Sequence, residues 1–97
     1  MNLKEVFSSH YLVLIDFYSK TCPPCQILEG ELVKSKEILK EGIEIFQVDQ
    51  QKQKKIFKTF KVNSVPHLKL FKAGKPVWEH TGLIAANELV NELNKWK

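Results

Sequence analysis

The chain has 97 residues, of which 43% are hydrophobic and 27% charged, with four glycines and four prolines. These values are typical of one globular domain, and they exclude a disordered chain, a collagen-like repeat and a multidomain enzyme. The formal net charge of +4 comes from 15 basic residues that are all lysine, and because arginine is the residue that forks onto phosphates and guanine edges, specific nucleic-acid binding is not expected.

The first half of the chain predicts two helices and two strands. Asn2 followed by Glu5 resembles a capping box at the start of a short helix. Residues 12–18 are apolar on both alternating faces and rich in β-branched and aromatic side chains, as expected for a central strand covered on both sides. Apolar residues then recur at roughly helical spacing until Gly42, a typical stop signal. The expected elements are helices over about 2–9 and 22–41, and strands over 12–18 and 43–48.

The second half predicts a helix, a hairpin and a last helix. Asp49 is expected to cap a basic helix that ends near Phe60 and whose lysines form its solvated face. A short connector with Gly74 separates two extended runs, which indicates a β-hairpin. An apolar face at helical spacing predicts the last helix. The expected elements are a helix over about 49–60, strands over 68–71 and 77–80, and a helix over about 85–96.

This order of elements predicts an α/β fold. A strand, a helix and a second strand favour parallel pairing through a crossover, and the hairpin then closes the sheet. Helices should cover both faces. No repeat or linker interrupts the order, so we expect a single domain over 1–97.

The two cysteines, Cys22 and Cys25, flank Pro23 and Pro24 at the junction of a predicted strand and helix. A disulfide here closes a very short loop and would stabilise the fold by only about 2 kcal/mol in the loop-entropy model. A zinc site would need two further ligands, and the chain has no other cysteine and no histidine pair at finger spacing. We expect no metal, and redox catalysis is the favoured interpretation.

Redox catalysis has a local physical basis. With Cys22 at the N-cap, Pro23 occupies the first helical position, where its fixed φ fits. Pro24 has no N–H, so the amide of Cys25 is the natural donor to the Cys22 sulfur. That donor and the positive end of the helix dipole favour a thiolate at Cys22, the expected nucleophile. Cys25, one turn inward, is expected to resolve the mixed disulfide.

Several segments in order carry a resemblance to a known family. They are Leu14-Ile15-Asp16-Phe17, Cys22-Pro23-Pro24-Cys25, Val48-Asp49, Val65-Pro66, Phe71-Lys72-Ala73-Gly74-Lys75 and Gly82. With this set the sequence resembles the thioredoxin family over essentially its whole length. The resemblance implies a thioredoxin-like three-layer sandwich, whose central mixed sheet would be four-stranded because the family's first strand has no counterpart here.

The resemblance also implies roles for individual residues. Pro66 would be a cis-proline beside the cysteines, and the backbone of Val65 would pair with an extended substrate segment. Gly82 would let the substrate backbone approach. Asp16 would lie beneath Cys25 and act as the base that activates it, and the alternative is a strand-end carboxylate that reaches water. His67 follows Pro66 closely enough to influence Cys22, although a structural or solvent-facing position is the more common one for such a histidine.

The chain departs from the family pattern around this site. Thr21 stands where the family usually has tryptophan, and Pro23 where it usually has glycine. Gly30 replaces a helix-kinking proline. Ile45 replaces the lysine that commonly pairs with the buried aspartate, which leaves Asp16 more desolvated.

The expected function is that of a protein disulfide reductase working through a mixed disulfide on Cys22. It would bind no cofactor beyond its own redox-active Cys22–Cys25 disulfide, and its partners would be disulfide-containing proteins. The resemblance implies electrons from NADPH through a separate flavin enzyme similar to thioredoxin reductase. A disulfide oxidase or isomerase, or a redox-sensing binding module, are the alternatives.

The expected location is the cytoplasm, with no membrane partner and a monomeric state. The longest uninterrupted apolar run covers only 11–15. A run of that length cannot span a bilayer or form the apolar core of a secretory signal.

Overall fold

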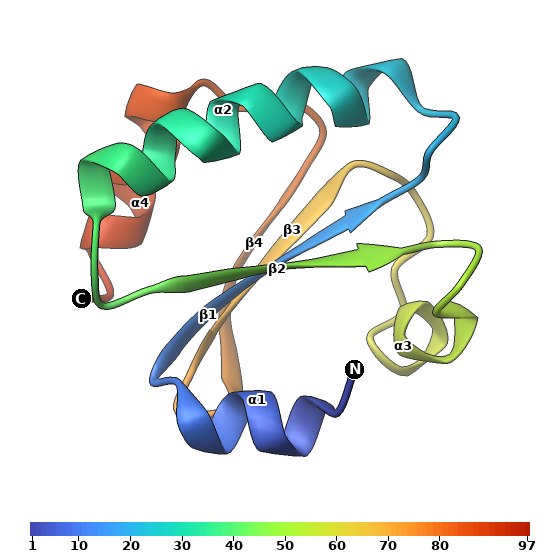
Figure 1. The fold of residues 1–97 in the computed structure, drawn as a ribbon, viewed down its shortest axis with the longest axis horizontal. Helices are drawn as coiled ribbons and strands as arrows, with labels where there is room; N and C mark the ends of the chain where they lie inside the picture. Colours follow the sequence, from blue (N-terminus) through green and yellow to red (C-terminus); the bar gives the residue numbers. More distant parts are fainter.

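The computed structural model describes residues 1–97 as one sheet between two layers of helices, with α2 and α4 on one face and α1 and α3 on the other (Figure 1). The strands form one mixed sheet in the order β2-β1-β3-β4. This confirms the expected four-stranded α/β sandwich. In chain order the elements are α1 Leu3–Ser9, β1 Leu12–Tyr18, α2 Pro23–Leu39, β2 Glu44–Asp49, α3 Lys54–Thr59, β3 His67–Lys72, β4 Lys75–Thr81 and α4 Ala86–Asn94.

β1 is the central strand, and its pairing fixes the register of the sheet. It pairs in parallel with β2, where Asp16 lies opposite Gln47, and antiparallel with β3, where Phe17 lies opposite His67. β3 and β4 form the expected hairpin. Its two turn residues, Ala73 and Gly74, both have positive φ (52° and 79°), as a tight two-residue hairpin turn requires.

Each face of the sheet carries its own core, and β1 contributes to both because successive strand side chains point to opposite faces. Leu14 packs in the cluster that α2 and α4 cover, together with Leu28 and Leu89. Ile15 packs in the other cluster, beneath α1 and α3, together with Phe57. The continuous apolar run of β1 is therefore explained by burial on both sides.

The start of α1 agrees with the sequence, whereas the start of α3 does not. The side chain of Asn2 accepts the N–H of Glu5 at 3.2 Å and caps α1. Asp49 was expected to cap the third helix, but it ends β2 and accepts the N–H of Gln51 at 2.8 Å. This prediction is wrong because an aspartate stabilises a local turn as readily as a helix start. The N-cap of α3 is Gln53, which makes no capping bond with its side chain.

The ends of α2 and α4 are held by side chains from other elements. α2 ends at Leu39, two residues before the expected position, and its C-cap residue Lys40 has a φ of 58°. Lys97 donates to the carbonyl of Leu39 at 3.1 Å. α4 has Ala85 at its N-cap, which offers no side-chain acceptor, and the carboxylate of Glu31 in α2 accepts the N–H of Ala86 instead, at 2.8 Å. None of the helices is both long and apolar enough to cross a membrane.

Candidate active site

The cysteines lie at the first turn of α2, and they form a disulfide. Cys22 is the N-cap, and its sulfur accepts the backbone N–H of Cys25 at 3.1 Å. Pro23 and Pro24 occupy the first two helical positions, so Cys25 provides the first amide that can reach the cap. The local geometry expected from the sequence is therefore confirmed.

This geometry distinguishes the two sulfurs chemically. The relative exposure of Cys22 is 9%, and that of Cys25 is 4%, so the first cysteine is the more accessible of the two. After reduction, the Cys25 amide and the positive end of the α2 dipole would both stabilise a thiolate at Cys22. The Cys25 amide hydrogen bond goes to the Cys22 sulfur, so Cys22 is the sulfur that gains this additional stabilisation.

The loop before the cysteines is polar and partly fixed by its own side chains. The backbone N–H of Thr21 donates to the hydroxyl of Ser19 at 3.3 Å, and the two hydroxyls are 3.2 Å apart. Ser19 is buried, whereas Thr21, Pro23 and Pro24 are exposed. The side chains around Cys22 are therefore smaller and more polar than the tryptophan typical of the family at position 21.

A second segment of backbone lies beside the end of β1 that leads to the cysteines. Phe17 pairs with His67, and Pro66 therefore lies next to this strand end. The Val65–Pro66 peptide bond is cis, as expected. The N–H of Gly82 donates to the carbonyl of Pro66 at 2.9 Å, so Gly82 is brought to the same place from the end of β4.

Val65 and Gly82 leave room for a further segment of chain. Val65 lies outside every helix and strand and takes part in none of the backbone hydrogen bonds of the turns and loops. Gly82 has a φ of +93°, and no atom lies within 4 Å of the position that a Cβ would occupy. An extended peptide could therefore pair with the backbone at Val65 while passing close to Gly82.

Asp16 is buried in the sheet, with a relative exposure of 1%. The alternative of a carboxylate that reaches water is therefore wrong. Its Oδ2 accepts the side-chain N–H of Gln47 at 3.3 Å, and its Oδ1 has no hydrogen-bond partner. Burial raises the pKa of Asp16 to about 6; the hydrogen bond from Gln47 lowers this pKa, and the negative charge of Glu29 raises it. A carboxyl with this pKa can take up a proton near neutral pH.

His67 is bonded on both ring nitrogens to β4. Nδ1 lies 2.9 Å from the Thr81 hydroxyl, and Nε2 lies 2.9 Å from the Glu79 carboxylate. Burial lowers the pKa of His67, and the bond to Glu79 opposes this effect. These contacts agree with the structural role, because both nitrogens are already engaged in holding the β3–β4 hairpin.

Two polar residues act on Asp16 that were not among the expected site residues: Gln47 and Glu29. Gln47 follows Ile45 by two positions in β2, so the alternation of a strand places both on the same face. That pattern could have singled out Gln47 once Ile45 was aligned with the family's lysine. Glu29 gives no comparable signal, because it is one of many charged residues along α2.

No group of three or more histidine, cysteine, aspartate or glutamate side chains is arranged to hold a metal ion. The reactive groups that the site does contain are the two sulfurs and the buried carboxyl of Asp16. A thiolate at Cys22, a second thiol at Cys25 and a base at Asp16 are the groups needed for thiol–disulfide exchange.

Comparisons with known proteins agree with this geometry. A family model described as Thioredoxin matches residues 2–95. A thioredoxin-like protein of Synechocystis sp. is 35% identical over 81 residues, which cover 84% of this chain and 77% of the relative. Thioredoxin Y, chloroplastic, of Oryza sativa subsp. japonica is 32% identical over 81 residues, but this match covers only 48% of its length. The chain thus spans about half the length of the chloroplastic relatives that it matches.

The fold is similar to that of solved structures. A mutant thioredoxin from Halobacterium salinarum superimposes with a TM-score of 0.88 at 30% sequence identity, over 97% of this chain and 81% of the other. A chloroplastic thioredoxin z gives a TM-score of 0.87 at 20% identity, covering 96% of this chain.

Proposed function

The chain belongs to the thioredoxin family, and we propose that it is a protein disulfide reductase. The observation that carries this proposal is the first turn of α2. There the Cys22 sulfur is bonded to Cys25 and accepts the Cys25 amide at 3.1 Å. A sulfur at a helix N-terminus is the usual setting of a reactive thiolate, and a partner cysteine three residues on completes a two-thiol centre.

The reaction proceeds in two exchanges. The Cys22 thiolate attacks one sulfur of a substrate disulfide, a mixed disulfide forms, and the other substrate sulfur leaves as a thiolate. Asp16 then takes the proton from Cys25. The Cys25 thiolate attacks the Cys22 sulfur, the bond to the substrate breaks, and the second substrate sulfur leaves with its electron pair. The substrate is reduced to a dithiol, and the protein is left with the Cys22–Cys25 disulfide.

Substrate recognition is proposed at Val65, Pro66 and Gly82, together with the loop residues Thr21, Pro23 and Pro24. The free backbone at Val65 supports pairing with an extended substrate, and the open space at Gly82 supports a close approach. Hydrogen bonds to the substrate backbone do not depend on which side chains the substrate carries, which suits an enzyme that acts on many disulfide-containing proteins.

The remaining partners follow from the family and are part of the proposal. The oxidised protein would be reduced by a separate flavin enzyme of the thioredoxin reductase type, with electrons from NADPH. The protein would carry electrons as a cytoplasmic monomer, with no bound cofactor other than its own disulfide.

The direction of the reaction is tested by the reduction potential of the cysteine pair in glutathione buffers. A value of roughly −220 to −320 mV, in the range of the cytosolic glutathione poise, is expected for a reductase. A value near about −120 mV would mark an oxidant instead and would overturn the proposed direction.

The roles of the two cysteines are tested with single variants. Cys25→Ser should accumulate a stable mixed disulfide with a substrate such as insulin, visible as a mass increase that dithiothreitol reverses. Cys22→Ser should form no adduct and should not reduce insulin. Substrate reduction by Cys22→Ser at the rate of the unchanged protein would show that Cys22 is not the nucleophile.

A further inference from the structure

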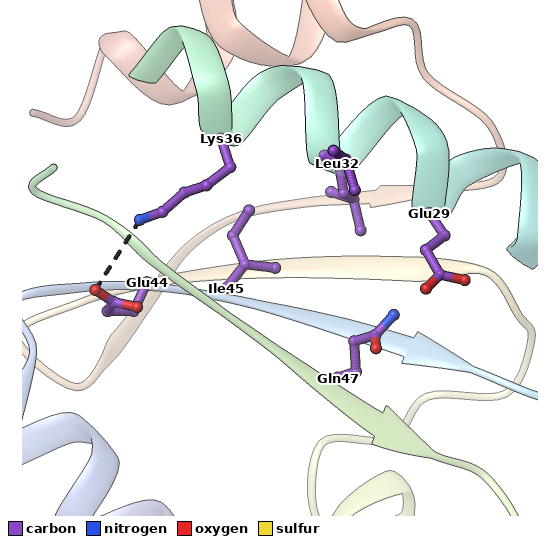
Figure 2. Close-up of a pocket in the computed structure, with 7 residues that line it drawn as sticks. Glu29, Leu32, Lys36, Glu44, Ile45 and Gln47 are labelled. Carbon is purple, nitrogen blue, oxygen red and sulfur yellow. Dashed lines mark ion pairs between the residues drawn. The ribbon is translucent and has the colours of Figure 1, made fainter. Parts of the chain in front are cut away.

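A solvent-facing cleft separates α2 from β2 on the face of the sheet that contains Asp16. Its volume is about 260 Å³. Figure 2 shows Leu32 and Ile45 in its middle, Lys36 and Glu44 paired at one end, and Glu29 and Gln47 facing one another at the other. The charged groups of the cleft are therefore divided between its two ends, with apolar side chains between them.

The end formed by Glu29 and Gln47 lies beside Cys25. A second hollow of about 180 Å³ is lined by both of these residues and also by Cys25. Gln47 makes the one side-chain hydrogen bond that Asp16 receives, at 3.3 Å, and Oδ1 of Asp16 has no partner. Asp16 therefore depends on a single donor, and that donor lies in the wall of a hollow that Cys25 shares.

Lys20 and Tyr18 also line the smaller hollow beside Cys25. The remaining charged groups on this face are paired with other residues or lie farther along the sheet. Lys36 lies 4.0 Å from Glu44 and also donates to the carbonyl of Ile43. In β3 the register partner of Asp16 is Leu68, which carries no charge. Beyond it in β4 lies His80, whose Nε2 is 2.9 Å from the carbonyl of Leu83. In α4, Glu88 and Glu92 line a hollow with His80. Glu29 is the one charged side chain that acts on the Asp16 carboxyl, and its negative charge raises the pKa of Asp16.

We propose that Gln47 and Glu29 are opposing positioning residues for the resolving step: Gln47 holds the Asp16 carboxylate ready to accept the Cys25 proton, and Glu29 opposes its ionisation. Together they set the pH above which Cys25 attacks the mixed disulfide. This inference rests on the proposed roles of Cys25 and Asp16. In this chain, a neutral donor and a second carboxylate act where family members commonly have a lysine.

Gln47 and Glu29 should have opposite effects on the pH that the resolving step needs, because the step requires an ionised Asp16. Before the step, Asp16 must be a carboxylate, which the Gln47 N–H stabilises and the Glu29 charge destabilises. During the step the proton moves from the Cys25 sulfur to Asp16, while the new sulfur–sulfur bond forms and the substrate thiolate leaves. Loss of Gln47 should therefore raise the pH needed for the step, and loss of the Glu29 charge should lower it.

Single-turnover reaction with 5,5′-dithiobis(2-nitrobenzoate) tests the inference. The reduced protein releases one thionitrobenzoate when Cys22 attacks the reagent and a second when Cys25 resolves the mixed disulfide. Stopped-flow absorbance from pH 4.5 to 8 follows both releases in the same sample. The variants are Gln47→Met, which keeps the chain length without the donor, and Glu29→Gln, which removes only the charge. Glu44→Gln, at the far end of the cleft, is the matched control.

The midpoint of the second release should move to higher pH in Gln47→Met and to lower pH in Glu29→Gln. Below the midpoint, the second release should slow about tenfold in Gln47→Met, because the lost hydrogen bond is to a charged group. In Glu29→Gln it should accelerate about threefold, because the removed charge is exposed to solvent. Glu44→Gln should behave as the unchanged protein, and the first release should be the same in all four.

The two releases separate failure of this inference from failure of the proposed function. No second release in the unchanged protein would contradict the assignment of Cys25 as the resolving thiol. If the second release instead occurs normally in the unchanged protein, its pH midpoint decides the outcome. A midpoint that neither Gln47→Met nor Glu29→Gln moves would overturn the roles assigned here, as would a midpoint that moves in the same direction in both variants. A purely structural role would alter both releases together without moving the midpoint of the second.

Discussion

Replacement of Asp16 with asparagine should stabilise the folded protein at neutral pH. The asparagine side chain has nearly the same shape and can still accept the hydrogen bond from Gln47, but it carries no charge. Burial raises the pKa of Asp16 from 3.8 to about 6, so at pH 7.5 the folded state contains a buried carboxylate that the unfolded state exposes to water. The difference of about 2 pH units corresponds to about 3 kcal/mol of lost stability, at 1.36 kcal/mol per unit.

The stability difference between Asp16→Asn and the unchanged protein should depend on pH, and the direction of the pKa shift decides how. Because the folded pKa is the higher one, the folded state binds the proton more tightly, and the penalty is complete above about pH 6. It falls as the pH decreases from about 6 to 3.8 and disappears below 3.8, where the carboxyl becomes neutral in both states. Asp16→Asn should therefore be more stable than the unchanged protein by about 3 kcal/mol at pH 7.5 and by only about 0.5 kcal/mol at pH 4.

Urea denaturation of the oxidised proteins at pH 7.5, 6, 5 and 4, followed by circular dichroism, measures the difference. Glu37→Gln is the control, because Glu37 is an exposed carboxylate on α2 and its replacement should change stability little at any of these pH values. An Asp16→Asn variant no more stable than the unchanged protein at pH 7.5 would refute the reasoning, as would a difference that stays constant from pH 7.5 to 4.

Two further predictions concern neighbouring positions of α2. Leu28 is fully buried and Ile27 is 58% exposed. In urea denaturation, Leu28→Ala should lower the free energy of unfolding by about 2 to 5 kcal/mol and Ile27→Ala by less than about 0.5 kcal/mol. Similar losses at both positions would contradict the described packing of α2. Gly30 lies inside the helix, and no atom lies within 4 Å of the place that a Cβ would take there, so Gly30→Ala should stabilise by about 1 kcal/mol. Gly42→Ala, at a φ of +94°, should instead lower the melting temperature, and a gain at both glycines would contradict the assigned backbone conformations.

The sequence predicted the elements whose signals are local. The Asn2 cap, the burial of β1 on both faces and the cap at Cys22 each depend on residues within a few positions, and all three are found in the structure. Asp49 shows the limit of such signals, since the same side chain suits a turn or a helix start. The structure assigns it to the turn.

The surroundings of Asp16 required the three-dimensional structure. Its hydrogen-bond donor, Gln47, is 31 residues away in the sequence, and the pairing register of β1 and β2 brings the two together. The sequence contains no local sign of that register. The resemblance to a family pointed to Asp16 and to the missing lysine at Ile45. Strand alternation from Ile45 leads to Gln47, but no feature of the sequence marks Glu29.

The carboxylate of Glu31 at the start of α4 has a consequence for the C-terminal helix. Glu31 accepts the backbone N–H of Ala86 although it lies 55 residues earlier in the chain. Ala85, the N-cap residue, makes no side-chain capping bond. A helix of nine residues is unstable alone in water, and without a cap it is weaker still. A peptide containing only the last helix should therefore be unstructured, and it should become helical when added to a fragment that contains α2. In this chain the C-terminal helix is a candidate for fragment complementation, with Glu31 as the residue on which reassembly depends.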